Sequence, residues 1–269
     1  MILSLLAFGL SGLSSGVLSG LFGVGGGALV VPLLLLLGVP IKLAVVMSLV
    51  YILFASLSGS LRHWKQGNIR PSTTAALSLS SGLGIYLGVK VSLGLSESML
   101  ALLFAVFMGL VLTLFALRQH LSKKVDAQDA VLETSHSLFK IWGGLIFTGV
   151  LAGFCSSIFG VGGGFIIVPL LVLTNPITMK QATGTSLATI FFIALAGVAQ
   201  HLIIGEAAQD LPAQAAPLVC LIIGGLVGAP LGARLNQRWS EKTLQRGFIG
   251  FTILIMLYML ANAWLKAGA

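Results

Sequence analysis

Long apolar runs separated by short polar segments dominate the chain. Eight apolar elements are predicted, at about residues 2–37, 43–61, 72–90 and 98–117 in the first half and 141–174, 181–204, 211–233 and 243–265 in the second. These runs are close to or above the roughly 20 residues that an α-helix needs to cross the hydrocarbon core. Strands of a membrane barrel would instead alternate apolar and polar positions over about ten residues. The pattern therefore predicts an all-α, polytopic integral membrane protein in the lipid bilayer.

One long polar stretch divides the chain. It reads RQHLSKKVDAQDAVLETSHSLFK and holds three of the seven acidic residues. We therefore expect a first transmembrane repeat at 1–117, a linker at 118–140 and a second transmembrane repeat at 141–269. The N-terminal stretch lacks the basic leader of a signal peptide and has a partner inside the chain, so we expect it to belong to the mature structure.

A glycine-rich motif occurs twice in the sequence. Residues 22–34 read FGVGGGALVVPLL and residues 159–171 read FGVGGGFIIVPLL, with ten of thirteen positions identical. The match extends over nearly the whole chain when small gaps are allowed. Matched pairs include Ser48 with Ser186, His63 with His201 and Phe104 with Phe248. The two halves are therefore predicted to be structural repeats.

Loop charges indicate how the two repeats are oriented. The segment LRHWKQGNIRP carries Arg62, Lys65 and Arg70, whereas its counterpart HLIIGEAAQDLP has neither Lys nor Arg. The next pair of loops reverses this bias, because ARLNQRWSEKTLQR is strongly basic and the matching stretch around Lys90 is nearly uncharged. Lys and Arg are in excess in cytoplasmic loops. The charges therefore predict two inverted repeats of about four helical elements each, with the linker in the cytoplasm and an odd number of crossings per repeat.

The glycine motif interrupts the first element of each repeat. Three consecutive glycines are poor helix formers, and Pro32 or Pro169 fits best in the first turn of a new helix. We expect the chain to unwind at the glycines and to restart near the proline, as a half-helix that dips into the membrane or a short tilted span. An unwound backbone at that depth must be buried in protein or line a water-filled cavity.

The restart of a helix offers free amides and the positive end of a dipole, which together bind an anion without a basic side chain. Inverted repeats with half-helix N-termini aimed at an anionic substrate are a recurrent transporter arrangement. The candidate substrate-binding glycines are Gly25, Gly26, Gly27, Gly162, Gly163 and Gly164. The alternative is that they only let helices cross closely, the role expected for glycines at four-residue spacing such as Gly12, Gly16 and Gly20.

Small hydroxyl residues follow the motif in each repeat. The segment MKQATGTSLATI at 179–190 places Thr183, Thr185 and Ser186 at the start of a long helix, and Ser48 matches Ser186 in the first repeat. These four side chains are candidates to hydrogen-bond an oxyanion substrate. Ser and Thr are also common caps at helix starts, so the two interpretations stay open.

Two matched pairs of basic residues flank the same helices. Lys42 and Lys180 precede them and either attract anions or anchor the helices at the membrane interface. His63 and His201 lie near their ends, where a histidine either senses pH or gates the protein, or simply bonds a loop carbonyl.

Composition restricts the class of function. Hydrophobic residues make up 57% of the chain and charged residues 8%, against roughly 25% charged in soluble domains. The net charge of +8 lies in loops that flank the spans, so no nucleic acid partner is expected. All seven Asp and Glu residues lie in or beside loops, which disfavours carboxylate-coupled symport. No nucleophile motif and no Cys or His spacing typical of a metal site occurs, so neither an enzyme nor a bound metal or cofactor is predicted.

The doubled F-G-V-G-G-G-x-x-x-V-P-L-L motif, the A-T-G-T-S-L segment at 182–187 and two H-x-x-x-G pairs resemble the TauE/SafE family of sulfite exporter-like permeases. The resemblance covers almost the entire chain. It implies a multi-pass protein of the cell inner membrane that exports small anions such as sulfite or organosulfonates. The chain departs from the family pattern at VVMSL (45–49), which implies that the repeats contribute unequally to a site. A passive anion channel and a non-transporting accessory subunit are the alternatives, and the oligomeric state stays open.

Overall fold

A computed structural model describes residues 2–96, 99–100, 102–103, 106–107, 109–110, 138–174, 177–204, 210–240, 242–250, 253–254 and 257. Residues 118–137 of the predicted linker, and most of the fourth apolar element of each half, lie outside this range. The elements are, in chain order, α1 (Ile2–Phe22), α2 (Gly27–Leu36), α3 (Ile41–Lys65), α4 (Pro71–Gly94), α6 (Leu138–Phe159), α7 (Gly164–Thr174), α8 (Met179–Ile204), the 3-10 helix η3 (Pro212–Gln214) and α9 (Ala215–Arg238).

Helices account for all regular secondary structure in the part of the chain that the structure describes. Six of them, α1, α3, α4, α6, α8 and the segment from η3 through α9, are long and apolar enough to cross a membrane. The prediction of an all-α, polytopic membrane protein is confirmed. α3 and α4 extend beyond the predicted apolar runs at both ends. Basic residues continue α3 as far as Lys65, and Pro71 occupies the first position of α4.

The first apolar element of each half is broken at the glycine motif, as predicted. α1 ends at Phe22 and α2 begins at Gly27, and the same break separates α6 from α7. α2 has 10 residues, so it rises about 15 Å, roughly half of the hydrocarbon thickness. Gly26, just before α2, lies beside the carbonyl of Ser15 in α1, so the chain turns back on itself at the break.

The second limb does not restart at the proline. α2 begins at Gly27, and Pro32 lies inside the helix. Gly26 adopts the left-handed conformation (φ 80°), and its carbonyl accepts hydrogen bonds from the amides of Leu29 and Val30, which already closes the first turn. The expectation of a restart near the proline is therefore wrong, because the third glycine of the motif can begin the helix itself.

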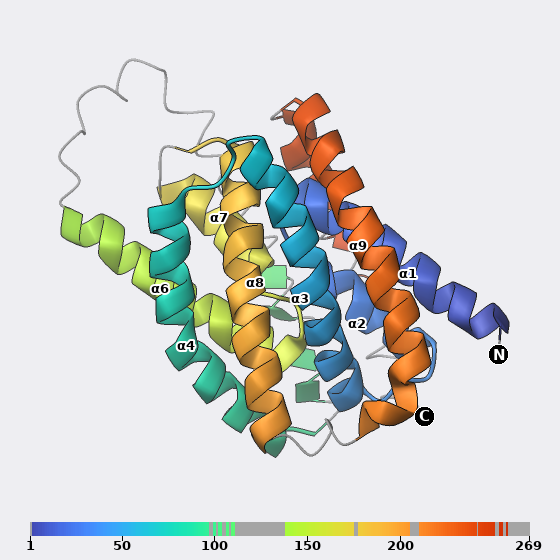
Figure 1. Ribbon diagram of the computed structural model, residues 1–269. Coiled ribbons are helices and arrows are strands. Elements are labelled where there is room, and N and C mark those ends of the chain that lie inside the picture. The colour runs from blue at the N-terminus through green and yellow to red at the C-terminus, as the bar shows by residue number, and fades with distance from the viewer. Residues whose placement is uncertain are drawn as a thin grey trace.

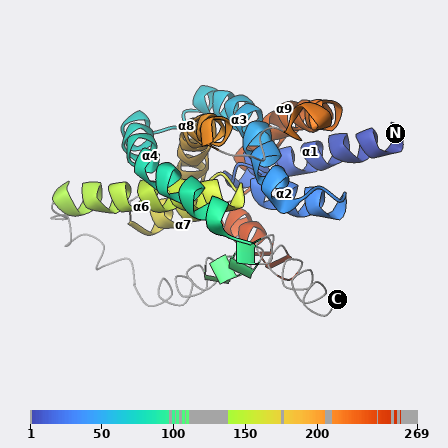
Figure 2. The same ribbon diagram turned by 90° about the horizontal axis from the view of Figure 1, so that it is seen from below.

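The helices form two layers (Figure 1). In one layer α4, α8, α3 and α9 lie side by side, with α3 and α8 in the middle, and the two broken elements lie in the other layer (Figure 2). α1 packs along α9, and α6 packs along α4. Each broken element therefore packs against the third long helix of the opposite half, and this exchange of partners joins the two halves.

Glycines make these exchanged contacts close. A Cβ atom added to Gly16 would lie 3.0 Å from backbone atoms of Gly225 and Ala229 in α9. Gly84 of α4 meets the backbone of Val150 in α6 in the same way. The packing role expected for glycines at four-residue spacing is therefore confirmed at both helix pairs.

The equivalent helices α3 and α8 run antiparallel. Gly59, near the end of α3, lies against Leu187 near the start of α8, and Gly197 near the end of α8 lies against Leu49 near the start of α3. This direction is the one that inverted repeats require, and the inversion relative to the membrane stays a prediction. It also brings the basic end of α3 next to the start of α8.

Candidate functional site

The two glycine motifs meet at the centre of the molecule. A side chain at Gly27 would collide with the carbonyl of Gly160, and one at Gly164 would collide with the carbonyl of Gly23. All residues from 22 to 28 and from 159 to 165 are buried. The candidate glycines of the two repeats therefore form one buried cluster, although 137 residues separate the motifs in sequence.

Backbone conformation explains why glycine is needed here. Gly25 and Gly26 have φ angles of 79° and 80°, and the equivalent Gly162 and Gly163 have 85° and 78°. Residues with a side chain rarely adopt this left-handed region. The consecutive left-handed residues reverse the chain within the space of one helical turn.

Helix starts at the motif leave amide donors without acceptors. The amides of Gly25, Gly26 and Gly27 donate no hydrogen bond within the described part of the chain, and neither do those of Gly162, Gly163 and Gly164. The carbonyl of Gly163 accepts from Ile166 and Ile167, which closes the first turn of α7 as Gly26 does for α2. Two helix N-termini, each with its positive dipole end, therefore face the same buried region.

Ser48 and Ser186 connect the repeats across this region. The hydroxyl of Ser48 donates to the carbonyl of Gly160, and that of Ser186 donates to the carbonyl of Gly23, each at 2.7 Å. Both serines are fully buried. Each candidate serine thus binds the glycine turn of the other repeat, and its single O–H group is engaged by a backbone oxygen.

The two candidate threonines have different surroundings. Thr185 accepts a hydrogen bond of 3.1 Å from the backbone amide of Arg70, so it holds the loop between α3 and α4 against the start of α8. Thr183 is fully buried, and its hydroxyl has no hydrogen-bond partner in the described residues. A Cβ atom on Gly23 would lie 2.7 Å from the Thr183 Cα, which places Thr183 directly against the glycine turn.

The two repeats differ at the position of Thr183. In the first repeat, Val45 occupies the place of Thr183, and it lies against Gly160 as Thr183 lies against Gly23. A methyl group therefore replaces the buried hydroxyl in the half where the sequence departs from the A-T-G-T-S-L pattern.

Two isoleucines fill the space between the glycine turns. Cβ atoms on Gly25 and Gly162 would each lie 3.0–3.4 Å from methyl groups of both Ile52 and Ile190. The sequence analysis did not single out these side chains. The sequence repeat could have identified them, because Ile52 follows Ser48 by four residues and Ile190 follows the matched Ser186 by four residues.

His63 and His201 bond main-chain carbonyls. Nε2 of His63 donates to the carbonyl of Gly20 at 3.0 Å, and its Nδ1 then accepts from the Asn68 amide at 3.2 Å. Nε2 of His201 donates to the carbonyl of Ser157 at 3.3 Å. Both histidines bond carbonyls as one alternative predicted, but the acceptors lie in the last turns of α1 and α6 rather than in loops, and a role in pH sensing or gating stays a prediction.

The matched lysines differ. Nζ of Lys180 donates to the carbonyl of Gln237 at 3.0 Å, so it caps the end of α9, while Lys42 is exposed at the start of α3. Around Lys180, Arg70 donates from its Nη2 to Gln181 at 3.1 Å, and Gln66 donates to the carbonyl of Ala233 at 3.3 Å. These contacts close the basic end of the molecule over the start of α8.

Comparison with known protein families matches residues 8–259 to the family described as sulfite exporter TauE/SafE. The chain belongs to the TauE/SafE family. Two similar relatives within it are a probable membrane transporter protein of Methanocaldococcus jannaschii, 28% identical over 91% of each chain, and one of Bacillus subtilis, 28% identical over 87% of this chain and 89% of the relative. A probable membrane transporter protein of Haemophilus influenzae is 28% identical over 93% of this chain and 96% of its own. No solved structure matches the TauE/SafE chain.

Proposed function

We propose that this TauE/SafE protein is a permease that exports small anions across the cell inner membrane, with sulfite and organosulfonates as the first candidates. The family is described as sulfite exporters, and the similar relatives are named membrane transporters. The observation that carries the proposal is the meeting of two helix N-termini, at Gly27 and Gly164, in one buried cluster.

The proposed substrate ligands are backbone amides. Amides of Gly25, Gly26 and Gly27, with those of Gly162, Gly163 and Gly164, lack acceptors among the described residues and lie at positive dipole ends. An oxyanion has several acceptor oxygens, so it satisfies such donors without a basic side chain. Thr183, Thr185, Ser186 and Ser48 border the cluster. The hydroxyl of Thr183 has no partner in the described residues and that of Thr185 only accepts a hydrogen bond, so both can donate to a substrate oxygen.

Transport requires that the motifs separate. The hydrogen bonds from Ser48 to Gly160 and from Ser186 to Gly23 cross between the repeats and hold the motifs together in the arrangement described here. Rocking of one repeat against the other would break these bonds on one side at a time and open the amides to that side. Export of one negative charge gains about 2.3 kcal/mol at 100 mV, so an anion can leave the cell without a coupling ion.

Flux measurements test the proposal. Purified protein in proteoliposomes is expected to move sulfite, sulfoacetate or a related sulfonate with saturation and countertransport. Gly163→Leu is expected to abolish flux, because position 163 has a φ of 78° and a side chain there would meet Ala152. Gly82→Leu is the matched control, since no atom lies within 4 Å of its Cβ position.

Four outcomes would contradict the proposal. Absence of flux for every sulfur oxyanion and sulfonate would overturn the substrate class. Flux without saturation or countertransport would favour a passive channel, and absence of any anion flux would favour an accessory subunit. Full activity of Gly163→Leu would remove the glycine cluster as the site.

A further inference from the structure

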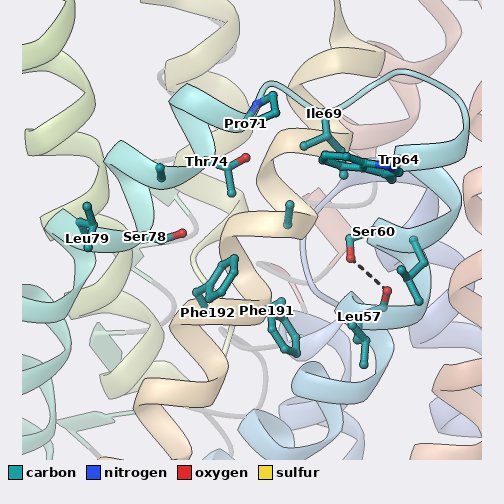
Figure 3. Close-up of a pocket in the computed structure, with 13 residues that line it drawn as sticks. Leu57, Ser60, Trp64, Ile69, Pro71, Thr74, Ser78, Leu79, Phe191 and Phe192 are labelled. Atoms are coloured by element: carbon teal, nitrogen blue, oxygen red, sulfur yellow. Dashed lines mark hydrogen bonds between the residues drawn. The ribbon is translucent and has the colours of Figure 1, made fainter.

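An apolar groove of about 600 Å³ opens on the side of the molecule between α3, α4 and α8. Its walls include Leu61 and Trp64 from α3, Ala75 and Leu79 from α4, and Phe192 from α8. Figure 3 shows Trp64 at one end of the groove near Pro71, and Phe191 and Phe192 further along it. Volumes of 300–1,000 Å³ are typical of pockets that hold small ligands.

The lining is almost entirely hydrocarbon. The hydroxyl of Ser60 donates to the carbonyl of Leu57 at 2.9 Å, and that of Thr74 donates to the carbonyl of Arg70 at 3.1 Å. These two hydroxyls are therefore occupied by local backbone carbonyls, whereas the third hydroxyl of the lining, that of Ser78, is buried without a hydrogen-bond partner in the described residues. Trp64, Leu79 and Phe192 are 62%, 84% and 48% exposed, so the groove faces the surroundings of the protein, which for this class of helix is the lipid phase.

Cations lie at the Trp64 end of the groove. Lys65 lies one turn beyond Leu61 on the same face of α3 and is exposed, and Arg70 lies between two lining residues of the loop that leads into α4. Neither makes an ion pair with a described residue, and Asp210, the acidic residue within the described ranges, precedes α9 at the opposite end of the molecule. The positive charge is therefore not compensated by carboxylates that the structure describes.

The orientation of this end fits an anionic headgroup. It carries the basic loop at 61–71, which the positive-inside rule assigns to the cytoplasm, and tryptophan rings such as Trp64 prefer the level of the headgroups. Anionic lipids give the cytoplasmic leaflet its negative surface potential, and basic pockets between transmembrane helices on that side bind their headgroups.

A second apolar groove provides a natural contrast. It has about 450 Å³, lies between the first halves of α1 and α9, and is lined by residues such as Leu6, Leu10, Ile223 and Val227. No Lys or Arg is among the lining residues of either groove. The difference lies beside the grooves, because Lys65 and Arg70 adjoin lining residues of the first groove, whereas no Lys or Arg adjoins the lining residues of the second in sequence.

We infer that the groove between α3, α4 and α8 is a binding site for one anionic phospholipid of the cytoplasmic leaflet. An acyl chain lies between Leu61, Ala75 and Phe192, and the phosphate contacts Lys65 and Arg70. This inference does not depend on what the protein transports.

Native mass spectrometry of the full-length protein tests the inference. The protein is titrated with phosphatidylglycerol or phosphatidylcholine of identical acyl chains. One phosphatidylglycerol is expected to bind with preference, and its affinity is expected to fall with added salt. Lys65→Gln is expected to lower the affinity about fivefold and Lys65→Gln with Arg70→Gln about 25-fold, since each cation near the surface contributes about 1 kcal/mol.

Variants that place a bulky side chain in one groove or the other test whether lipid binding depends on the shape of the groove as well as on charge. Ala75→Trp is expected to abolish binding of the lipid, while Val227→Trp, which fills the second groove, is expected to leave it unchanged. The single Lys65→Gln exchange at an exposed position keeps the test valid if the double variant does not fold. Equal binding of the two phospholipids, or unchanged binding in Lys65→Gln or Ala75→Trp, would overturn the inference, as would cysteine crosslinks at Leu79 that reveal a second copy of the chain over the groove.

Discussion

The hydroxyl of Ser186 donates a 2.7 Å hydrogen bond to the carbonyl of Gly23, which joins α8 of one repeat to the glycine turn of the other. Ser48 makes the equivalent bond to Gly160 with the same length. Two short bonds between buried groups thus hold the glycine cluster together from both sides. Removing either hydroxyl is therefore expected to weaken the contact between the two glycine motifs.

Ser186→Ala is expected to lower the free energy of unfolding by about 1–3 kcal/mol, because it leaves the buried Gly23 carbonyl without a donor. Ser48→Ala is expected to have a similar effect. Thermal unfolding of the detergent-solubilised protein measures both. Ser58→Ala is the control, since that half-buried hydroxyl only bonds Ala55 in its own helix. A melting temperature of Ser186→Ala equal to the wild-type value would contradict this expectation.

Thr183→Val is expected to separate stability from transport. The exchange keeps the shape of a fully buried side chain and removes a hydroxyl that has no partner among the described residues, so stability should be unchanged or higher. If the hydroxyl donates to the substrate, the substrate KM should rise about tenfold, as expected for the loss of one hydrogen bond of roughly 1.4 kcal/mol. Flux measured beside a melting curve distinguishes the two effects. Thr189→Val serves as control because Thr189 bonds the Thr185 carbonyl. An unchanged KM would exclude Thr183 from the substrate site.

Gly20→Ala is expected to destabilise the pair of α1 and α9 by about 1–3 kcal/mol, because the added methyl group would overlap the backbone of Ala229. Gly9→Ala on the same helix is the control, since its Cβ would lie 3.9 Å from the Cys220 carbonyl, an ordinary contact distance. Chemical denaturation in detergent compares the two variants. Equal stability would show that close backbone approach is not what holds α1 on α9.

His63→Ala is expected to be more destabilising than His201→Ala by about 1 kcal/mol. His63 bonds both the Gly20 carbonyl and the Asn68 side chain, at 3.0 and 3.2 Å, whereas the His201 ring makes a longer bond of 3.3 Å to the Ser157 carbonyl. Melting temperatures of the two variants measured in the same detergent provide the comparison. The opposite order would show that the contacts of Asn68 do not stabilise the end of α3.

Most of the helices and both helix breaks could be predicted from the sequence. Apolar runs of about 20 residues are a strong local signal, and the glycine triplets marked both breaks. The start of α2 was predicted too late, because a proline was given more weight than a glycine that is able to begin a helix at Gly27. The exchanged pairing of α1 with α9 could not be predicted, since glycine spacing indicates a close contact but does not identify the partner.

The meeting of the two glycine motifs was predictable from the sequence, whereas the contacts around them were not, and the role of these residues in substrate binding stays a prediction. Two motifs in repeats of opposite charge bias indicated that they would face each other, and the structure brings Gly27 and Gly160 into contact. The sequence could not show that the hydroxyls of Ser186 and Ser48 donate hydrogen bonds to backbone carbonyls, because such bonds depend on side-chain geometry between distant segments. For the same reason, the sequence could not show that Thr185 accepts a hydrogen bond from the Arg70 amide while the Thr183 hydroxyl has no partner in the described residues.

The exchanged pairing also constrains how the protein is made. Gly12 of α1 lies against Leu221 of α9, about 200 residues later in the chain. At 5–20 residues per second, the ribosome needs about 10–40 s to deliver that partner. During this time the glycine face of α1 resides in the bilayer, or on a helper protein, without the helix it is shaped to meet. The first half cannot complete its packing during its own synthesis, because α1 and α4 await α9 and α6, so the membrane-inserted nascent chain becomes a single folded unit only near the end of translation.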